Sequence, residues 1–100
     1  MSDLRDKLKS EIMPAGWPEL RYQFARGGLL LVNPAHDLLE VAVAVARDDR
    51  DQVTALLSGG ALWRARDDDA RAFEAAPPRF QFVIVQPWVL AQVIGLPARA

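Results

Sequence analysis

The stretch FQFVIVQPWVLAQVI, from Phe80 to Ile94, carries no charged side chain. The uncharged run continues to Ala98 and is nominally long enough to span a bilayer. Three glutamines and Pro87 interrupt it, however, and polar amides and a helix-breaking proline oppose a membrane helix. The side chains between Phe80 and Val85 divide into two alternating faces, which is typical of a strand. We therefore expect a strand that begins at Arg79, and no membrane contact.

The second half of the stretch, Trp88 to Ile94, has Gln92 as its only strongly polar residue. A small monomer seldom leaves a contiguous apolar patch in water, so this C-terminal segment must either fold back over its own sheet or cover that of a neighbour. We expect a homodimer, since two-fold dimers are the commonest soluble assembly. The candidate interface residues are Trp88, Leu90, Val93 and Ile94.

Two segments upstream indicate the centre of the core. The run LLLV at Leu29–Val32 is typical of a buried strand that ends in a turn. Asp37 and Glu40 then have the spacing of a capping box, which predicts a helix from Leu38 to about Ala46. Because Glu40 is the only break in its apolar surface, we expect this helix to be covered on most sides.

The remaining elements are predicted from apolar stripes and from residues that start or stop helices. The sequence predicts a first helix capped by Ser2 and ended by Pro14, a second with Pro18 in its first turn and Gly27-Gly28 as its stop, a short helix between Asp49 and Gly59, a strand from Ala61 to Ala65, and a turn or two of helix capped by Asp67.

After the first helix, these elements run helix, strand, helix, turn, helix, strand, long connection and strand. This order resembles that of winged helix domains. We therefore predict a single α+β domain, residues 1–100, that is winged-helix-like, with helices packed on a small, three-stranded, mainly antiparallel sheet. The first helix and the apolar C-terminal segment are additions to that pattern. Ala46 occupies the place where helix-turn-helix motifs carry glycine, which argues against a DNA-docking geometry.

A second resemblance covers nearly the whole chain. The segments SDLRDKLKSEI, ARGGLLLVNPAHDLLEVAVAVA, DQVTALLSGGAL and FVIVQPWVL resemble a family of short bacterial proteins that is known only as a domain of unknown function. The resemblance implies a small soluble bacterial protein. It supplies no functional residues, because the family has no established activity.

Composition excludes several classes of function. The chain has 12 basic and 13 acidic residues, so no global charge draws it to nucleic acid or to an anionic membrane. It has no cysteine, which removes thiol chemistry and fits a reducing compartment. Its charged start lacks the apolar core of a secretory signal. We expect a cytoplasmic protein.

No catalytic or metal site can be assembled from the sequence. His36 is the only histidine, and no nucleophile or second acid-base group accompanies it and Asp37. The run Asp67–Asp69 has no EF-hand spacing and is typical of the start of a helix. The two glycine pairs lack phosphate-binding patterns. We therefore predict no catalytic residues, no metal and no cofactor, and favour a non-enzymatic protein.

Two function classes remain. The first is a protein-interaction or self-associating domain, and the alternative is a winged-helix nucleic-acid binder of the transcription-regulator type. The alternative would use Arg47, Arg50, Gln52, Arg64 and Arg66. Between Asp48 and Ser58, however, one arginine stands against three aspartates, whereas phosphate contacts need Lys and Arg. The sequence therefore favours a homodimer or a complex with another protein.

Overall fold

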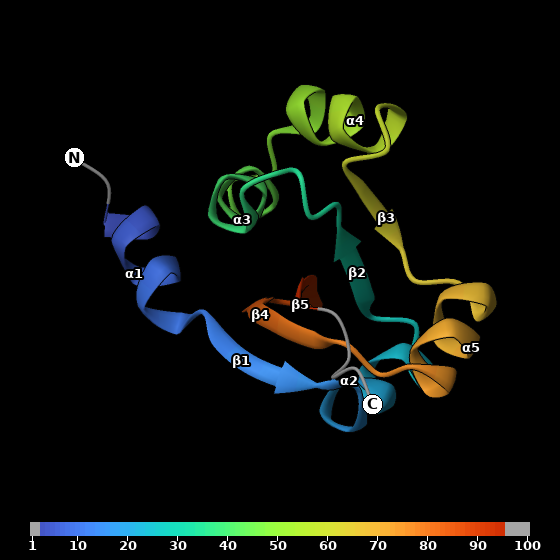
Figure 1. Cartoon of the computed structure of the whole chain (residues 1–100). Helices are drawn as coiled ribbons and strands as arrows, with labels where there is room; N and C mark the ends of the chain where they lie inside the picture. Colours follow the sequence, from blue (N-terminus) through green and yellow to red (C-terminus); the bar gives the residue numbers. More distant parts are fainter. Residues whose placement is uncertain (1–2, 96–100) are drawn as a thin grey trace.

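The structure is a computed structural model that describes residues 3–95, so the predicted cap Ser2 lies outside the described residues. Within that range the chain forms five helices and five strands (Figure 1). The helices are α1 (Asp3–Glu11), α2 (Trp17–Ala25), α3 (Leu38–Ala46), α4 (Arg50–Ser58) and α5 (Asp67–Ala75). The strands are β1 (Met13–Gly16), β2 (Leu29–Val32), β3 (Leu62–Arg64), β4 (Arg79–Val85) and β5 (Trp88–Gly95). No helix of residues 3–95 has both the length and the apolar character that a bilayer span requires.

All five strands join one mixed sheet in the order β1-β4-β5-β2-β3. β4 pairs antiparallel with β1 and with β5, and β2 pairs antiparallel with β3. The central pair, β5 and β2, is parallel, with Leu90 opposite Leu30. The edges of the sheet are therefore β1 and β3.

The α+β class is confirmed, but the predicted three-stranded sheet is wrong, because the sheet has five strands. β1 escaped prediction because its sequence, MPAG, contains proline and glycine, which are depleted in strands. Pro14 is tolerated there because β1 is an edge strand. The last two predicted strands, β3 and β4, are not neighbours in the sheet, since β5 and β2 lie between them.

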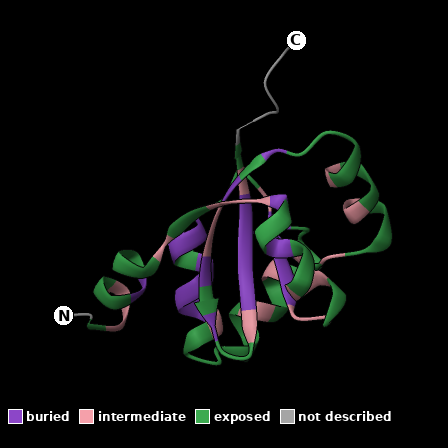
Figure 2. Cartoon of the chain, turned by 90° about the horizontal axis from the view of Figure 1, so that it is seen from below, coloured by how far each residue is buried: buried purple, intermediate pink, exposed green. Residues whose placement is uncertain are grey.

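Helices cover both faces of the sheet (Figure 1). α1, α3 and α4 pack over one face, and α2 and α5 pack over the other. β2 contributes side chains to the apolar clusters on both faces. Leu30 and Val32 belong to the cluster on the α3 side, and Leu29 and Leu31 belong to the cluster on the α2 side. Successive side chains of a strand point to opposite faces, so a strand covered on both sides is apolar throughout. In Figure 2 the buried residues accordingly concentrate along the strands, while the outer surfaces of the helices are exposed.

α3 begins and ends where the sequence predicts. The side chain of Asp37 accepts a hydrogen bond from the backbone N–H of Leu39 at 2.8 Å and caps the helix. Six of the nine residues of α3 are buried, because the sheet, α1 and α4 all pack against it. The predicted cap of α4, Asp49, likewise accepts from the N–H of Gln52 at 3.2 Å. At α5 the prediction is one residue off, since the capping position is Arg66.

The apolar C-terminal segment is strand β5, in the middle of the sheet. Leu90 and Ala91 have no exposed surface. The segment therefore packs within its own chain, with β4 on one side and β2 on the other. The sequence favours a place for this segment at a homodimer interface, because a parallel strand pairing between residues about sixty apart leaves no local signal.

Candidate interaction surfaces

The four candidate interface residues of β5 point to two different faces of the sheet. Trp88 and Leu90 pack in the cluster below α3, whereas Val93 packs against the cluster on the α2 side. Leu90 is fully buried and offers no surface to a partner. Ile94 is 48% exposed but lies six residues along the strand from Trp88, about 20 Å away. These residues do not form one patch.

A different apolar surface lies along β4. β1 pairs with residues 79–82 of β4, and on that side no strand of residues 3–95 pairs with Val83–Val85. Beside this unpaired edge, Met13 and Ile84 are 54% and 49% exposed, whereas Val83 and Val85 are buried. A hollow of about 520 Å³ lies here and is also lined by Lys7 and Glu11 of α1. We name Lys7, Glu11, Met13 and Val83–Val85 the β4-edge surface.

The β4-edge surface offers both main-chain and charged groups. An unpaired strand edge can present N–H and C=O groups to another strand, and here Ile84 is the exposed residue of that edge. Lys7 and Glu11 lie one helical turn apart on α1, and neither forms an ion pair with another described residue. The surface therefore combines an apolar strand edge with one charge of each sign.

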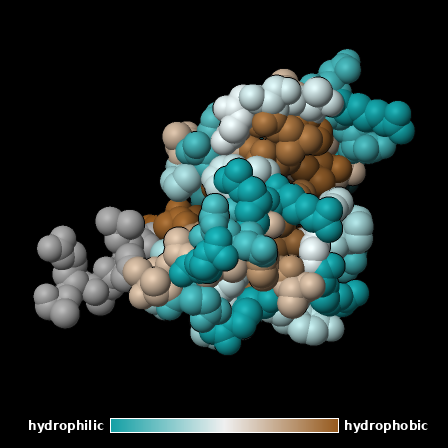
Figure 3. Space-filling model, turned by 90° about the vertical axis from the view of Figure 1, so that its right-hand side faces the viewer, coloured by the Kyte–Doolittle hydropathy of each residue, from teal (hydrophilic) through white to brown (hydrophobic). Residues whose placement is uncertain are grey.

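A second hollow, of about 640 Å³, lies between α4 and the sheet. We name it the α4 pocket. Figure 3 views the molecule from the side of α4, β3 and α5, and hydrophobic side chains gather in its upper half among hydrophilic ones. Three charged residues, Asp48, Arg50 and Arg64, also line the pocket. Its apolar walls are Leu30, Val45, Val53, Leu57, Leu62 and Trp88.

Arg64 is held at the α4 pocket by two contacts. Its Nε donates to the carbonyl oxygen of Gly27 at 2.9 Å, and its guanidinium carbon lies 5.8 Å from the ring centroid of Trp88, within cation–π range. Gly27 has a φ of 78°, and a Cβ there would lie 2.5 Å from Arg64 Nη2. Glycine thus leaves the space that the guanidinium fills. Neither Nη atom of Arg64 hydrogen-bonds to another residue of the described range.

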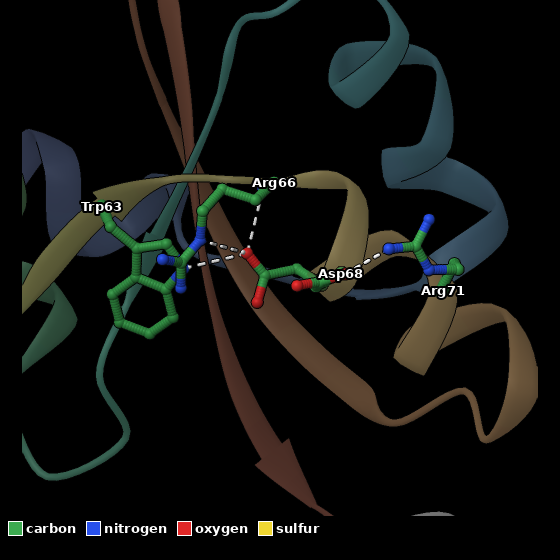
Figure 4. A network of polar contacts seen from close by, with 5 residues as sticks. Trp63, Arg66, Asp68 and Arg71 are labelled. Atoms are coloured by element: carbon green, nitrogen blue, oxygen red, sulfur yellow. Dashed lines mark hydrogen bonds and ion pairs between the residues drawn. The ribbon is translucent and has the colours of Figure 1, made fainter.

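Arg66, one of the five residues that a nucleic-acid binder would use, forms polar contacts within its own chain (Figure 4). Its Nε lies 3.6 Å from Asp69 Oδ2, and its backbone N–H donates to the same oxygen at 2.9 Å. The indole N–H of Trp63 donates to this oxygen as well, at 3.1 Å. Asp68 pairs with Arg71 on the same helix. This network fixes the start of α5 against β3.

The other residues of that alternative are only partly brought together. Arg47 is the C-terminal capping residue of α3. The backbone N–H of Gln52 donates to the side chain of Asp49. Arg50 and Arg64 share the α4 pocket. The structure thus joins two of the five residues, and it joins them around an apolar hollow. The sequence missed this hollow because Val53 and Leu57 have the spacing of a core-facing stripe, yet Leu57 is 50% exposed.

His36 takes part in the turn before α3 through its backbone. The amide nitrogen of the buried Gln92 donates to the carbonyl oxygens of Asn33 and His36 at 3.1 and 2.5 Å. The oxygen of Gln92 accepts from Gln81 at 2.7 Å. Among residues 3–95, no three or more His, Asp or Glu side chains gather closely enough to hold a metal ion. Asp67–Asp69 form the first turn of α5.

Comparison with known proteins places the chain in a family. A family model described as "Protein of unknown function (DUF2288)" matches residues 3–93. The NMR solution structure of PA1075 from Pseudomonas aeruginosa is similar, with 44% sequence identity and a TM-score of 0.82 over 100% of this chain and 93% of that one. No curated protein matches the chain significantly. The resemblance drawn from the sequence is confirmed: the chain belongs to the DUF2288 family of proteins of unknown function.

Proposed function

We propose that this protein is a non-enzymatic interaction domain that self-associates through the β4-edge surface. The observation that carries this proposal is the edge of β4 at Val83–Val85, which lacks a strand partner on the β1 side and exposes Ile84 next to Met13. Natural proteins usually block a free strand edge with proline, charge or a bulge. Pro14 does so for β1. Val83–Val85 carries no such residue; Leu8 of α1 packs in the same cluster as Val83 and Val85, and Ile84 stays exposed.

The occupant of this edge is a second copy of the chain. The sequence Val83-Ile84-Val85 is symmetric about Ile84, so two copies can pair antiparallel about a two-fold axis with like side chains opposite one another. Lys7 and Glu11 supply opposite charges at the same edge, so each copy offers the other a complementary pair. The two sheets then continue into one.

The homodimer expected from the sequence is therefore retained in this proposal. Its interface lies at the edge of β4 and not at Leu90. The nucleic-acid alternative has less support, because Arg66 is paired with Asp69 and the segment before and into α4 is acidic. We propose a bacterial cytoplasmic location. Its support is the cysteine-free composition and the similarity to a Pseudomonas aeruginosa protein.

Light scattering after size exclusion tests the proposal. At about 100 μM we expect the intact chain to show twice its mass of 11.1 kDa. Ile84→Lys should be monomeric, because a lysine on a strand edge opposes pairing. Leu57→Lys is the matched control: Leu57 is 50% exposed and Ile84 49%, but Leu57 lies on α4. A monomeric intact chain, or a dimer that Ile84→Lys leaves unchanged, would contradict the proposal.

A further inference from the structure

The α4 pocket has the form of a small-molecule site. Its volume of about 640 Å³ lies within the range of such sites, about 300–1,000 Å³. Side chains from three elements line it: Val45 from α3, Leu57 from α4 and Leu62 from β3. Partner proteins, in contrast, usually bury broad surfaces of roughly 800 Å² on each side. A concave, mainly apolar hollow of this size fits an aliphatic chain.

The charges of the pocket favour a ligand with a negative end. Arg50 and Arg64 stand against Asp48, which leaves one net positive charge. Arg64 is already positioned by Gly27 and Trp88 through its Nε and its π-face, and its Nη atoms make no hydrogen bond to residues 3–95. A guanidinium can donate two parallel hydrogen bonds to a carboxylate, and little entropy is lost when it is held in place beforehand.

We propose that the α4 pocket binds a small aliphatic carboxylate, with the alkyl chain against Val45, Leu57 and Trp88 and the carboxylate on the Nη groups of Arg64. The inference is independent of self-association, because the β4-edge surface uses none of these side chains. Binding is the whole activity proposed here, and no covalent step accompanies it.

Calorimetric titration with three probes of equal chain length tests the charge requirement. Octanoate should bind, and 1-octanol and octylammonium should bind at least about tenfold more weakly, because only octanoate can pair with a guanidinium. Amide shifts in a ¹⁵N-labelled sample should change in α4 and around Trp88. No binding, equal binding of the three probes, or shift changes confined to other parts of the chain would overturn the proposal.

Variants locate the two parts of the site. Arg64→Gln should weaken octanoate about tenfold and leave 1-octanol unchanged, because it removes the charge and keeps the aliphatic stem. Val53→Trp should weaken both probes by filling the hollow. Should Arg64→Gln fail to fold, Arg50→Gln carries the same test, with a smaller expected loss. Ile84→Lys is the control outside the pocket and should bind octanoate like the intact chain. Octanoate affinity that Arg64→Gln, or Arg50→Gln in its place, leaves unchanged would overturn the proposal.

Discussion

The side-chain nitrogen of Gln92 lies 2.5 Å from the backbone carbonyl oxygen of His36 and also donates to that of Asn33. Gln92 is 5% exposed, and its oxygen accepts from Gln81. This amide links β5 to the turn that leads into α3. Because a one-residue slip of a strand moves every side chain to the other face, a buried and fully bonded amide fixes the register of β5.

Gln92→Leu should therefore destabilise the domain strongly. The substitution leaves two backbone carbonyls and the amide of Gln81 without their partner, and we expect a loss of about 2–4 kcal/mol in the free energy of unfolding. Urea denaturation measures it, with the exposed Gln52→Leu as the control. A loss no larger than that of the control would show that water satisfies these groups equally well.

Val41→Asp should unfold the domain. Val41 is 2% exposed on α3, and a carboxylate placed there has no partner in the core. Glu40→Ala, at the neighbouring position, should leave the melting temperature almost unchanged, because Glu40 is exposed and its ion pair with Arg5 lies in solvent. Thermal melts of the two variants give the comparison. Equally mild effects would contradict the central place of α3 in the core.

The stability of the domain should fall on acidification partly through Glu74. The indole N–H of Trp17, at 2.6 Å, and the guanidinium of Arg21 hold the pKa of Glu74 below its ordinary value. The folded-state pKa is the lower one, so this contribution is present above the unfolded-state value of about 4.3 and is lost as the pH falls through the folded-state value.

Denaturation at about pH 7 and about pH 3 tests the sign of this effect. The intact chain should lose more stability between the two than Glu74→Gln, whose side chain does not titrate. Glu40 also has a lowered pKa, through Arg5, so Glu74→Gln should keep part of the dependence. Identical pH profiles for the intact chain and the variant would exclude a role for the Trp17–Glu74 bond.

Local patterns in the sequence predict the helices and three of the five strands. Asp37 and Asp49 act as caps where their spacing indicates, and β4 begins at Arg79 as its alternation predicts. The strand order and the full size of the sheet could not be predicted from such local patterns. β1 is too short and contains Pro14, and the parallel pairing of β5 with β2 joins segments far apart in the chain. Local periodicity carries no information on pairings of that kind.

The candidate surfaces depend on the same long-range pairings. The β4-edge surface exists because β1 stops opposite Phe82 and leaves Val83–Val85 without a strand partner on that side, a matter of relative strand length. Ile84 is the exposed residue of the three. The α4 pocket exists because Leu57 stays half exposed although its helical spacing suits a core position. The exclusions, in contrast, came from composition: without cysteine and with a single histidine, few catalytic sites can be built.

Duplex DNA should bind no more tightly than about 10 μM near physiological salt, weaker than specific binders. Only Arg50 and Arg64 of the five proposed contact residues share a site, and Asp48 lies beside them. Fluorescence anisotropy with random and genomic duplexes checks this expectation. Tighter binding that Arg64→Ala and Arg66→Ala abolished would reverse the ranking of the two functions.

Amide hydrogen exchange at two protein concentrations tests self-association through β4 most directly. When the concentration rises from about 5 to about 500 μM, exchange should slow at those amides of Val83–Val85 that face away from β5, because pairing with a second copy protects them. Trp63, on the opposite edge strand, should exchange at the same rate at both concentrations, and Ile84→Lys should lose the effect. Exchange at Val83–Val85 that is independent of concentration in the intact chain would contradict the account.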